Sequence, residues 1–421
     1  MSDCGLRRRM SAKLVSRLVG QVMDGDSQVT TPGLGRRTVL ASAAVVAAAG
    51  AGATVWAATR GTDDAGPAVS RTPASLHQVG VVTMPPTSAV LTAFDVRATD
   101  RAGLDATLRR LSTAITETTS RYAGSGRPVE ATVAVGASLF DDRFGLAEHR
   151  PRRLVTMPAF PNDVLDPARC HGDLLLQVCA GDAATTRSVL EEITTAGLVT
   201  RWRMAGFRDE NTVTAHGRAS DRNLFGFREG AGNPDVRDTA QMDRLVWAGP
   251  GSDEPAWTVG GTYQVVRTIR FATSLWDSEP IPRQEAVFGR RRQDGAPLGR
   301  DREDAEFDYA SDEAGQLIAL DAHIRRANPR TPQTEENRIL RRGYSYRGPV
   351  DVTGQRDEGM LFICFQQDLE RGFATVQRRL AGEALDRYLL PVGGGYYFVL
   401  PGRAGTSDDY LGRTLIDASQ Q

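Results

Sequence analysis

The order of strands and helices, which occurs twice along this chain, constrains its fold more than any other feature. In the first set, apolar residues from Leu104 to Ile115 recur at every third or fourth position, which predicts an amphipathic helix over residues 100–121. A second helix is predicted over residues 183–196. The apolar, β-branched runs around these helices predict strands at residues 89–96, 131–136, 173–180 and from 198 to 203.

The second half of the chain repeats this order. Residues 262–271 are largely alternating and β-branched, and residues 359–365 form a continuous apolar run, so both are predicted to be strands. A helix is predicted over residues 368–380, and residues 396–400 close the set as a further strand. Two such sets predict an α+β protein with duplicated ferredoxin-like domains.

Length and charge exclude several classes of protein. The 421 residues carry a formal net charge of −1, with 40% hydrophobic and 24% charged residues. This composition is typical of a soluble globular protein and excludes collagen-like, disulfide-scaffold and wholly disordered chains. A chain without a basic excess is not expected to bind nucleic acid. No CxxC pair occurs, so a zinc ribbon or thioredoxin-type site is not expected. Cys170 and Cys179 flank a predicted strand and are too far apart along it to pair easily, so we expect Cys170, Cys179 and Cys364 to be free and buried.

The N-terminal segment predicts where the protein is sent. Arg36 and Arg37 precede a run rich in alanine, glycine and valine over residues 41–58, after which the sequence becomes polar. This order is typical of a Tat export signal. We therefore interpret residues 1–75 as a signal and a disordered linker, with the rest placed in the periplasm, at the cell surface or outside the cell. An uncleaved anchor is the alternative, because residues 38–58 are long enough to cross a bilayer.

The remaining chain divides into two predicted domains. The first covers residues 76–210 and the second covers residues 211–421. The linker over about residues 210–260 contains the most informative motif. Its residues 223–235 read NLFGFREGAGNPD, in which three glycines surround Glu229 and allow the backbone to approach a flat ligand. Taken alone, the same run is also typical of a turn with a solvated glutamate.

Only five histidines are present, so each can be weighed as a ligand. His149 and His216 lie in polar segments, His171 precedes a predicted strand, and His77 begins the ordered chain. His323 differs, because apolar residues precede it and arginines follow it. An imidazole beside apolar surface and guanidinium groups suits an anionic, planar, hydrophobic ligand such as haem. A buried structural histidine is the alternative.

Three motifs together carry a resemblance to a known family. They are GFREGAGNP at residues 226–234, HIRRANPR at residues 323–330 and RRGYSY at residues 341–346. Alone, the third motif is typical of a charged surface turn. In this order and behind a Tat-like signal, the motifs resemble the dye-decolorizing peroxidase family, and in particular its Tat-exported, EfeB-type deferrochelatase/peroxidase branch. The resemblance implies dimeric α+β barrel-type domains with haem held between them.

The resemblance also implies roles for individual residues. His323 would be the proximal iron ligand, Arg341 the distal arginine, and Glu229 would stand where the family carries its distal aspartate. Arg290 would approach a haem edge or propionate, and Asp368 or Asp386 would bond the proximal imidazole N–H. The backbone of residues 230–232, which are Gly230, Ala231 and Gly232, would line the face of the haem.

Glu229 departs from the family pattern by one methylene group. It keeps a carboxylate, so it can still take a proton from peroxide. A change in reach near 1 Å can nevertheless cost on the order of 10²-fold in rate. Arg341 could still contribute much of the catalysis by electrostatic stabilisation.

The resulting prediction is an exported haem b peroxidase with one haem per chain. It would reduce hydrogen peroxide and oxidise dyes or phenols, with Tyr and Trp side chains as electron relays. One alternative is a deferrochelatase that releases iron from haem within an iron-uptake membrane complex. Another is a haem or iron carrier with negligible turnover. A non-haem metal site fits poorly, since the sequence shows no His/Cys ligand cluster. By the resemblance, a homodimer or a larger assembly is also expected.

Overall fold

The computed structural model describes residues 75–350, 354, 356–406 and 408–419. The predicted Tat signal and most of the predicted linker lie outside the described residues. No helix among the described residues is long and apolar enough to cross a membrane. The described residues all belong to one compact unit by their backbone contacts.

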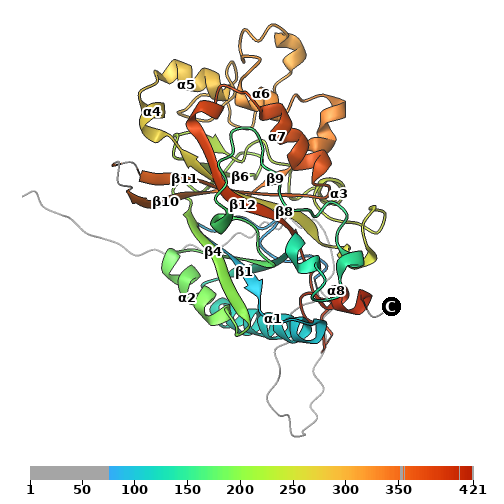
Figure 1. Ribbon diagram of the computed structural model, residues 1–421. Helices are drawn as coiled ribbons and strands as arrows, with labels where there is room; N and C mark the ends of the chain where they lie inside the picture. Colours follow the sequence, from blue (N-terminus) through green and yellow to red (C-terminus); the bar gives the residue numbers. More distant parts are fainter. Residues whose placement is uncertain (1–74, 351–353, 355, 407, 420–421) are drawn as a thin grey trace, which may run out of the picture. The chain divides into compact units, whose positions relative to one another are not determined.

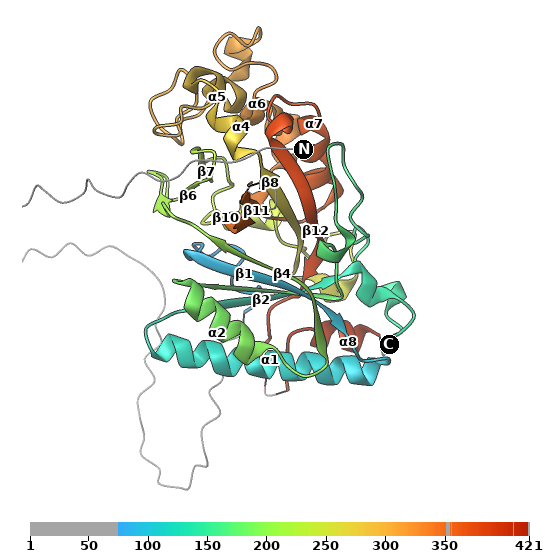
Figure 2. The same ribbon diagram turned by 60° about the vertical axis from the view of Figure 1, so that its left-hand side comes forward.

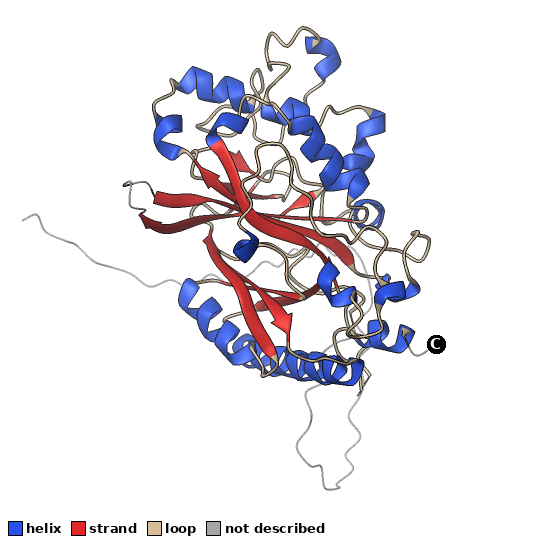
Figure 3. Ribbon diagram, in the orientation of Figure 1, coloured by secondary structure: helices blue, strands red, loops and turns tan. Residues whose placement is uncertain are grey.

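Eight antiparallel strands form a sheet that closes on itself (Figures 1 and 3). In their order around the sheet, the strands are β4 (Leu198–Phe207), β1 (Ser88–Val96), β3 (Leu174–Ala180), β2 (Glu130–Gly136), β12 (Leu389–Val399), β8 (Thr262–Phe271), β11 (Arg356–Gln366) and β10 (Tyr344–Val350). Four adjacent strands of this sheet, β4, β1, β3 and β2, come from the N-terminal half of the chain, and the other four come from the C-terminal half. The prediction of a duplicated α+β architecture is therefore confirmed.

Two seams of very different length join the halves. Strands β2 and β12 share three backbone pairs, from Gly136 opposite Tyr397 to Ala134 opposite Val399. Strands β4 and β10 share one pair, between Phe207 and Ser345. Within each half the ladders are longer, and β8 pairs with β12 along almost all of its length. Backbone pairing is therefore more extensive within each half than between the halves.

Alternation along the strands separates two sets of apolar side chains. In β1, Ala89 and Leu91 face the interior of the closed sheet, where they pack with Leu175 of β3. Val90 and Phe94 face outwards and belong to a second cluster. The sheet therefore has a packed interior and an outer face that needs a covering.

Two helices cover the outer face of the N-terminal half (Figure 2). Helix α1 (Arg101–Gly124) buries the stripe from Leu104 to Ile115 that the sequence predicts. Helix α2 (Ala183–Ile193) buries Val189 and Leu190 beside it. Each helix begins at an aspartate whose carboxylate accepts a backbone N–H of the first turn, and such a cap contributes about 1 kcal/mol.

Short helices cover the C-terminal half instead. These are α3 (Thr239–Leu245), α4 (Thr273–Asp277), α5 (Ile281–Phe288), α6 (His323–Ala327), α7 (Thr375–Leu380) and α8 (Arg413–Ala418). The helix predicted over residues 368–380 begins instead with one π-helical turn, Glu370–Ala374, before α7. The strand predicted from residue 396 begins at Leu389, because the glycines at 393–395 continue its ladder with β8.

The segment predicted as a linker is folded. It forms a small three-stranded sheet from β5 (Thr212–Val213), β6 (Ala219–Arg222) and β7 (Arg228–Glu229), followed by α3. A further short strand, β9 (Leu340–Arg341), pairs with β11 just before β10 begins.

The cysteine prediction is confirmed. Cys170, Cys179 and Cys364 are free and buried.

Candidate active site

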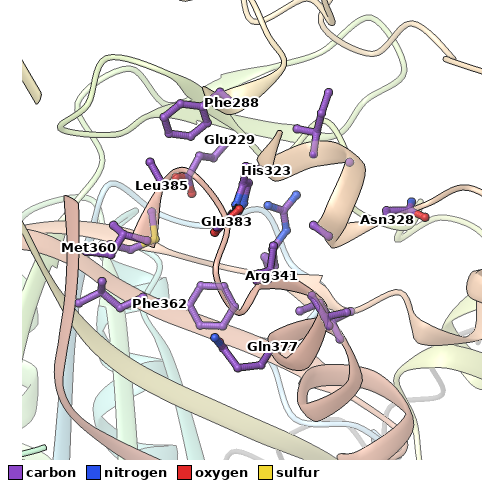
Figure 4. Close-up of a pocket in the computed structure, with 18 of the residues that line it drawn as sticks. Glu229, Phe288, His323, Asn328, Arg341, Met360, Phe362, Gln377, Glu383 and Leu385 are labelled. Carbon is purple, nitrogen blue, oxygen red and sulfur yellow. Dashed lines mark hydrogen bonds and ion pairs between the residues drawn. The ribbon is translucent and has the colours of Figure 1, made fainter. Parts of the chain in front are cut away.

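A large cavity lies between the outer face of the C-terminal half of the sheet and helices α6 and α7 (Figure 4). It encloses about 1700 Å³ of space free of atoms, part of which is open solvent. Its apolar walls include Phe225, Ile269, Phe271, Phe288, Ile324, Met360, Phe362, Leu385 and Leu389, and its polar walls include Asn223, Glu229, Arg290, His323, Asn328, Arg330, Arg338, Arg341 and Glu383.

His323 enters this cavity as the first residue of α6. Its Nδ1 lies 2.9 and 3.0 Å from the two carboxylate oxygens of Glu383, whose side chain is 2% exposed. Burial lowers the pKa of the imidazole, but the charge and hydrogen bond of Glu383 outweigh it and raise that pKa overall. With Nδ1 held by Glu383, Nε2 is the nitrogen left for a ligand, and a carboxylate partner makes it a stronger donor to a metal.

The prediction of an aspartate beside the proximal imidazole is wrong. Asp386 lines the cavity, but its carboxylate accepts the backbone N–H of Gly382. Asp368 accepts the N–H groups of residues 370 and 371 and so starts the π-helical turn. Glu383 takes the predicted role, because the turn after α7 carries its carboxylate back towards α6. The sequence gives little sign of it, since Glu383 is 60 positions from His323 and belongs to none of the three motifs.

Glu229 lies on β7 and is held by its own motif. Asn223 Nδ2 donates to Glu229 Oε1 at 2.6 Å, which fixes the carboxylate and leaves Oε2 free of that bond. Gly230 follows with φ +110°, and a Cβ there would lie 1.9 Å from the carbonyl oxygen of Ala219. Only glycine therefore fits at position 230, where the chain after Glu229 passes close to the backbone of β6.

Arg341 reaches the cavity from β9 and is held by a second asparagine. Asn233 Nδ2 donates to the Arg341 carbonyl at 2.8 Å, while Asn233 Oδ1 accepts the Arg341 backbone N–H at 3.1 Å. Arg341 Nε also donates to this oxygen, at 3.3 Å. A Cβ on Gly232 would lie 3.3 Å from Arg341 Nη2, so the glycine keeps space beside the guanidinium group. Asn223 and Asn233 lie within the glycine-rich motif, yet only the structure reveals their positioning role.

A smaller polar cavity adjoins the first and is lined by four arginines and four acidic residues. Arg290 is 8% exposed, and its Nη1 donates to the carbonyls of Gly295 and Glu303 at 2.6 and 2.7 Å. Burial, together with the charges of Arg330 and Arg341, lowers its pKa to about 10. The lining of this smaller cavity also includes Arg218, Arg330 and Arg338, with Ala231 and Gly232 at its boundary with the main cavity.

The structure thus brings the predicted site residues to one place. Glu229, His323 and Arg341 line the main cavity together with residues 230–232 and Arg290. Of the five histidines, all within the described part of the chain, only His323 lines it. His216 lies elsewhere, with its Nδ1 2.9 Å from Asp304, and is therefore paired as well as partly exposed.

Comparison with known proteins decides the family. A family model described as Dyp-type peroxidase, N-terminal, matches residues 78–208, and its C-terminal counterpart matches residues 220–404. The chain belongs to the Dyp-type peroxidase family. As a member of this family it is a haem-dependent enzyme of the peroxidase/deferrochelatase type, so the predicted resemblance is confirmed.

Relatives of this Dyp-type peroxidase cover most of its length. Proteins called deferrochelatase from Escherichia coli strain K12 and from Shigella flexneri are each 44% identical over 363 residues, covering 81% of this chain and 86% of theirs. A DyP-type peroxidase from Cellulomonas bogoriensis is 34% identical with a TM-score of 0.74, covering 82% of this chain and 98% of that one. Ferric DtpA from Streptomyces lividans is 33% identical with a TM-score of 0.72, covering 82% and 96%.

The residues present fit the haem of the Dyp-type peroxidases. His323 offers Nε2 to iron, and the apolar walls suit the porphyrin ring. The Nε atoms of Arg218 and Arg338 are buried without a hydrogen-bond partner, so these two arginines have donors to spare for the two propionates. No group of three or more His, Cys, Asp or Glu side chains within the described range is arranged to hold a metal ion.

Proposed function

We propose that this protein is an exported haem b peroxidase that reduces hydrogen peroxide and oxidises dyes or phenolic donors. The observation that carries the proposal is that His323, backed by Glu383, shares one cavity with Glu229 and Arg341. One haem per chain would occupy the cavity. When bound, haem supplies the iron that reacts with peroxide and holds two oxidising equivalents until donors return the electrons.

Glu229 and Arg341 would perform the proton and charge chemistry. Glu229, oriented by Asn223, accepts a proton from hydrogen peroxide and returns it to the departing oxygen as water. Arg341, anchored by Asn233, donates hydrogen bonds where negative charge develops on the peroxide oxygens. The orienting bonds fix both groups before peroxide arrives, so little reorganisation is needed during the reaction.

Aromatic rings extend from the proximal side and are proposed electron relays. The rings of His323 and Phe288 have centroids 5.9 Å apart, and Phe288 and Trp276 follow at 5.6 Å. Trp276 and Tyr388 come next at 4.9 Å, and the Tyr388 hydroxyl donates to Glu279 Oε1 at 2.6 Å. A donor that docks outside the cavity could pass electrons along this path, with Glu279 accepting the phenolic proton.

Release of iron from haem is the second candidate, because relatives at 44% identity are called deferrochelatase. In that reaction two protons replace the iron and the porphyrin stays intact. It would place the protein in iron uptake, next to a membrane complex. The same cavity would hold the substrate.

A hemin titration followed by hydrogen peroxide tests the function. A Soret band that saturates near one haem per chain, with a spectral change on adding peroxide and donor-dependent turnover, is the expected result. Fluorescence of metal-free porphyrin in the products would identify the dechelating activity. Saturable binding without either reaction would favour a carrier, and the absence of a specific Soret band would overturn the role of His323.

Export is tested on the N-terminal segment. We expect residues 1–75, fused to a reporter that is active only outside the cytoplasm, to give activity that disappears when Arg36 and Arg37 are both changed to lysine. Retained activity in this double variant would contradict the Tat route. Fractionation of the full chain would separate a released protein from an anchored one.

A further inference from the structure

A small polar cavity lies directly behind Glu229. It has about 20 Å³ for the centres of water-sized molecules, which is enough for one bound water. Its walls carry the side chains of Arg208, Asp221, Glu229, Arg341 and Tyr344. Two carboxylates and two guanidinium groups therefore meet around a space that the peroxidase chemistry described so far does not use.

Asp221 is placed against Glu229 by the small sheet. Strands β6 and β7 pair Asp221 directly with Glu229, and directly opposed residues project to the same face of a ladder. Asp221 is only 6% exposed. Its Oδ1 accepts the backbone N–H of Glu210 at 3.3 Å, so its other side faces the surface loop that follows β4. The carboxyl group thus stands between that loop and the cavity behind Glu229.

The neighbouring Arg208 has a hydrogen-bond donor without a partner. Arg208 Nε lies 4.0 Å from Asp221 Oδ2, at the limit of an ion pair, and this nitrogen is buried without a hydrogen-bond partner. Arg208 Nη1 is engaged elsewhere, donating to the carbonyl of Gly343 at 3.2 Å. A water in the cavity would have a donor in Arg208 and acceptors in Asp221 and Glu229, which meets the two to four partners that a buried water needs.

The charge balance around Asp221 lets it exchange a proton near neutral pH. Burial raises its pKa, the charge of Arg208 opposes this, and the charge of Glu229 raises it further, to about 6. Arg341 and Tyr344 face the same cavity from β9 and β10. An aspartate with an ordinary pKa would remain ionised over the range in which Asp221 is half protonated.

We propose that Asp221 passes protons from the surface to Glu229 through one water bound between them. The proposal rests on the proposed peroxidase function. Turnover follows H₂O₂ + 2 e⁻ + 2 H⁺ → 2 H₂O. The proton that Glu229 moves from one peroxide oxygen to the other cancels out, so two more must reach the site. Asp221 gives a proton to the water, the water gives one to Glu229, and Asp221 regains its proton beside the Glu210 loop.

The kinetic test compares D221N with the matched control E210Q. Glu210 carries a charge in the same loop, but its carboxylate pairs with Arg222 and Arg228 instead. Ferrocyanide is the donor, because it delivers electrons without protons. In haem-loaded D221N we expect kcat to be at least about tenfold lower than in wild type. Wild-type kcat should decline above pH 6, since Asp221 must be protonated to donate, and this decline should be absent from D221N. We expect kcat/KM for peroxide to change less than about twofold, because Glu229 supplies that step. E210Q should match wild type.

A measurement without turnover checks the same group. Infrared titration of haem-free wild type should show a carboxylic acid C=O band that is lost with a midpoint near pH 6. The band should be absent from D221N. If D221N does not load haem, D221E replaces it in the kinetics, and a shifted pH limb supports the relay while an unchanged limb contradicts it.

Two results would overturn the relay. One is a parallel loss of kcat and kcat/KM in D221N, which a merely structural role predicts. The other is an infrared midpoint near that of an ordinary aspartate. Wild type that binds haem but does not turn over peroxide would instead overturn the proposed function, and the infrared titration would still report on Asp221.

Discussion

The two halves of the closed sheet have the same strand pattern but different coverings. In the N-terminal half, the long helices α1 and α2 lie directly on the strands and exclude solvent. In the C-terminal half, α6 and α7 have five and six residues, and they leave a cavity between themselves and β8 and β11. One copy of the architecture therefore provides a packed core, and the other provides room for a ligand.

The outward residues of the strands account for this difference. In the first half the outward residues under the helices are mostly apolar, as with Val133 of β2 and Leu176 of β3, both at 1% exposure or less, and the polar ones in β1, Ser88 and Thr92, are uncharged. In β8 the outward row contains Arg267 beside Ile269 and Phe271, and all three line the cavity. A charged side chain in that row cannot be covered by an apolar helix stripe without a large desolvation cost. Its carboxylate partner is Asp163, which is equally buried.

The largest effect should come from removing the iron ligand. We expect H323A to lose peroxide turnover to background, because no other histidine lines the cavity, and to remain folded, because the N-terminal core is untouched. Steady-state peroxide consumption measures turnover, circular dichroism measures folding, and the Soret band reports whether haem is bound. H149A, in the N-terminal half, should retain both turnover and folding. Full turnover in H323A would show that the cavity is not the haem site.

Removing the distal arginine should cost less. We expect R341A to lower kcat/KM for peroxide by about 10²–10³-fold, or about 3–4 kcal/mol, because a preorganised donor to developing charge is lost. Stopped-flow mixing with peroxide measures this constant. R347A, on β10 with 48% of its side chain exposed, is the matched control. Equal losses in the two variants would indicate a general charge effect.

A core substitution tests the other half. We expect L108A in α1 to lower the free energy of unfolding by about 2–5 kcal/mol, because it creates a cavity in a packed cluster. Urea unfolding should give the same loss in the haem-free and haem-loaded protein. F288A, at the wall of the haem cavity, should instead weaken haem binding. If L108A weakened haem binding as strongly, the proposed separation of roles would fail.

The polar site behind Glu229 should give a pH-dependent effect. Because folding raises the pKa of Asp221 from 3.8 to about 6, chiefly through burial, the folded state binds the proton more tightly. This contribution to the free energy of unfolding is present below the unfolded pKa and is lost as pH rises to about 6. It amounts to as much as about 3 kcal/mol. Urea unfolding of haem-free protein at pH 4 and pH 7 should show this loss in wild type and not in D221N. An equal change in both would contradict the assignment.

The smallest effect on this scale concerns the partner of His323. We expect E383Q to lower peroxide turnover or haem affinity by about 10–100-fold, because the carboxylate orients the imidazole and raises its basicity. Hemin titration and steady-state kinetics measure both. D386N removes a neighbouring carboxylate that bonds Gly382 instead, so it should stay within about threefold of wild type. A larger loss in D386N than in E383Q would instead support Asp386 as the partner of the imidazole N–H.

The sequence predicts most of the fold because strand and helix signals are local. The stripe from Leu104 to Ile115 appears in α1 as expected, and the alternating run at 262–271 has the bounds of β8. The prediction fails where tertiary contacts decide. The segment at 370–374 is π-helical, and the presumed linker contains β6 and β7, whose pairing sets Glu229 opposite Asp221.

The same contrast between local sequence signals and tertiary contacts applies to the candidate site. His323, Glu229 and Arg341 lie in motifs of characteristic composition, and the structure brings them into one cavity. Glu383 belongs to no motif, and only two residues separate it from Asp386, yet Glu383 is the one whose carboxylate reaches the imidazole. Such a choice depends on the path of the turn after α7, which spacing along the chain does not encode.

The single backbone pair between Phe207 and Ser345 has a consequence for local unfolding. Separating β4 from β10 breaks one ladder pair, whereas any other edge of the closed ring requires the loss of at least three. Partial opening of the ring therefore has its lowest free energy at this edge. Arg208 follows Phe207 directly, and Tyr344 precedes Ser345. The first interior surface that such a fluctuation exposes to solvent is thus the rear of the distal site, and the N-terminal core remains closed.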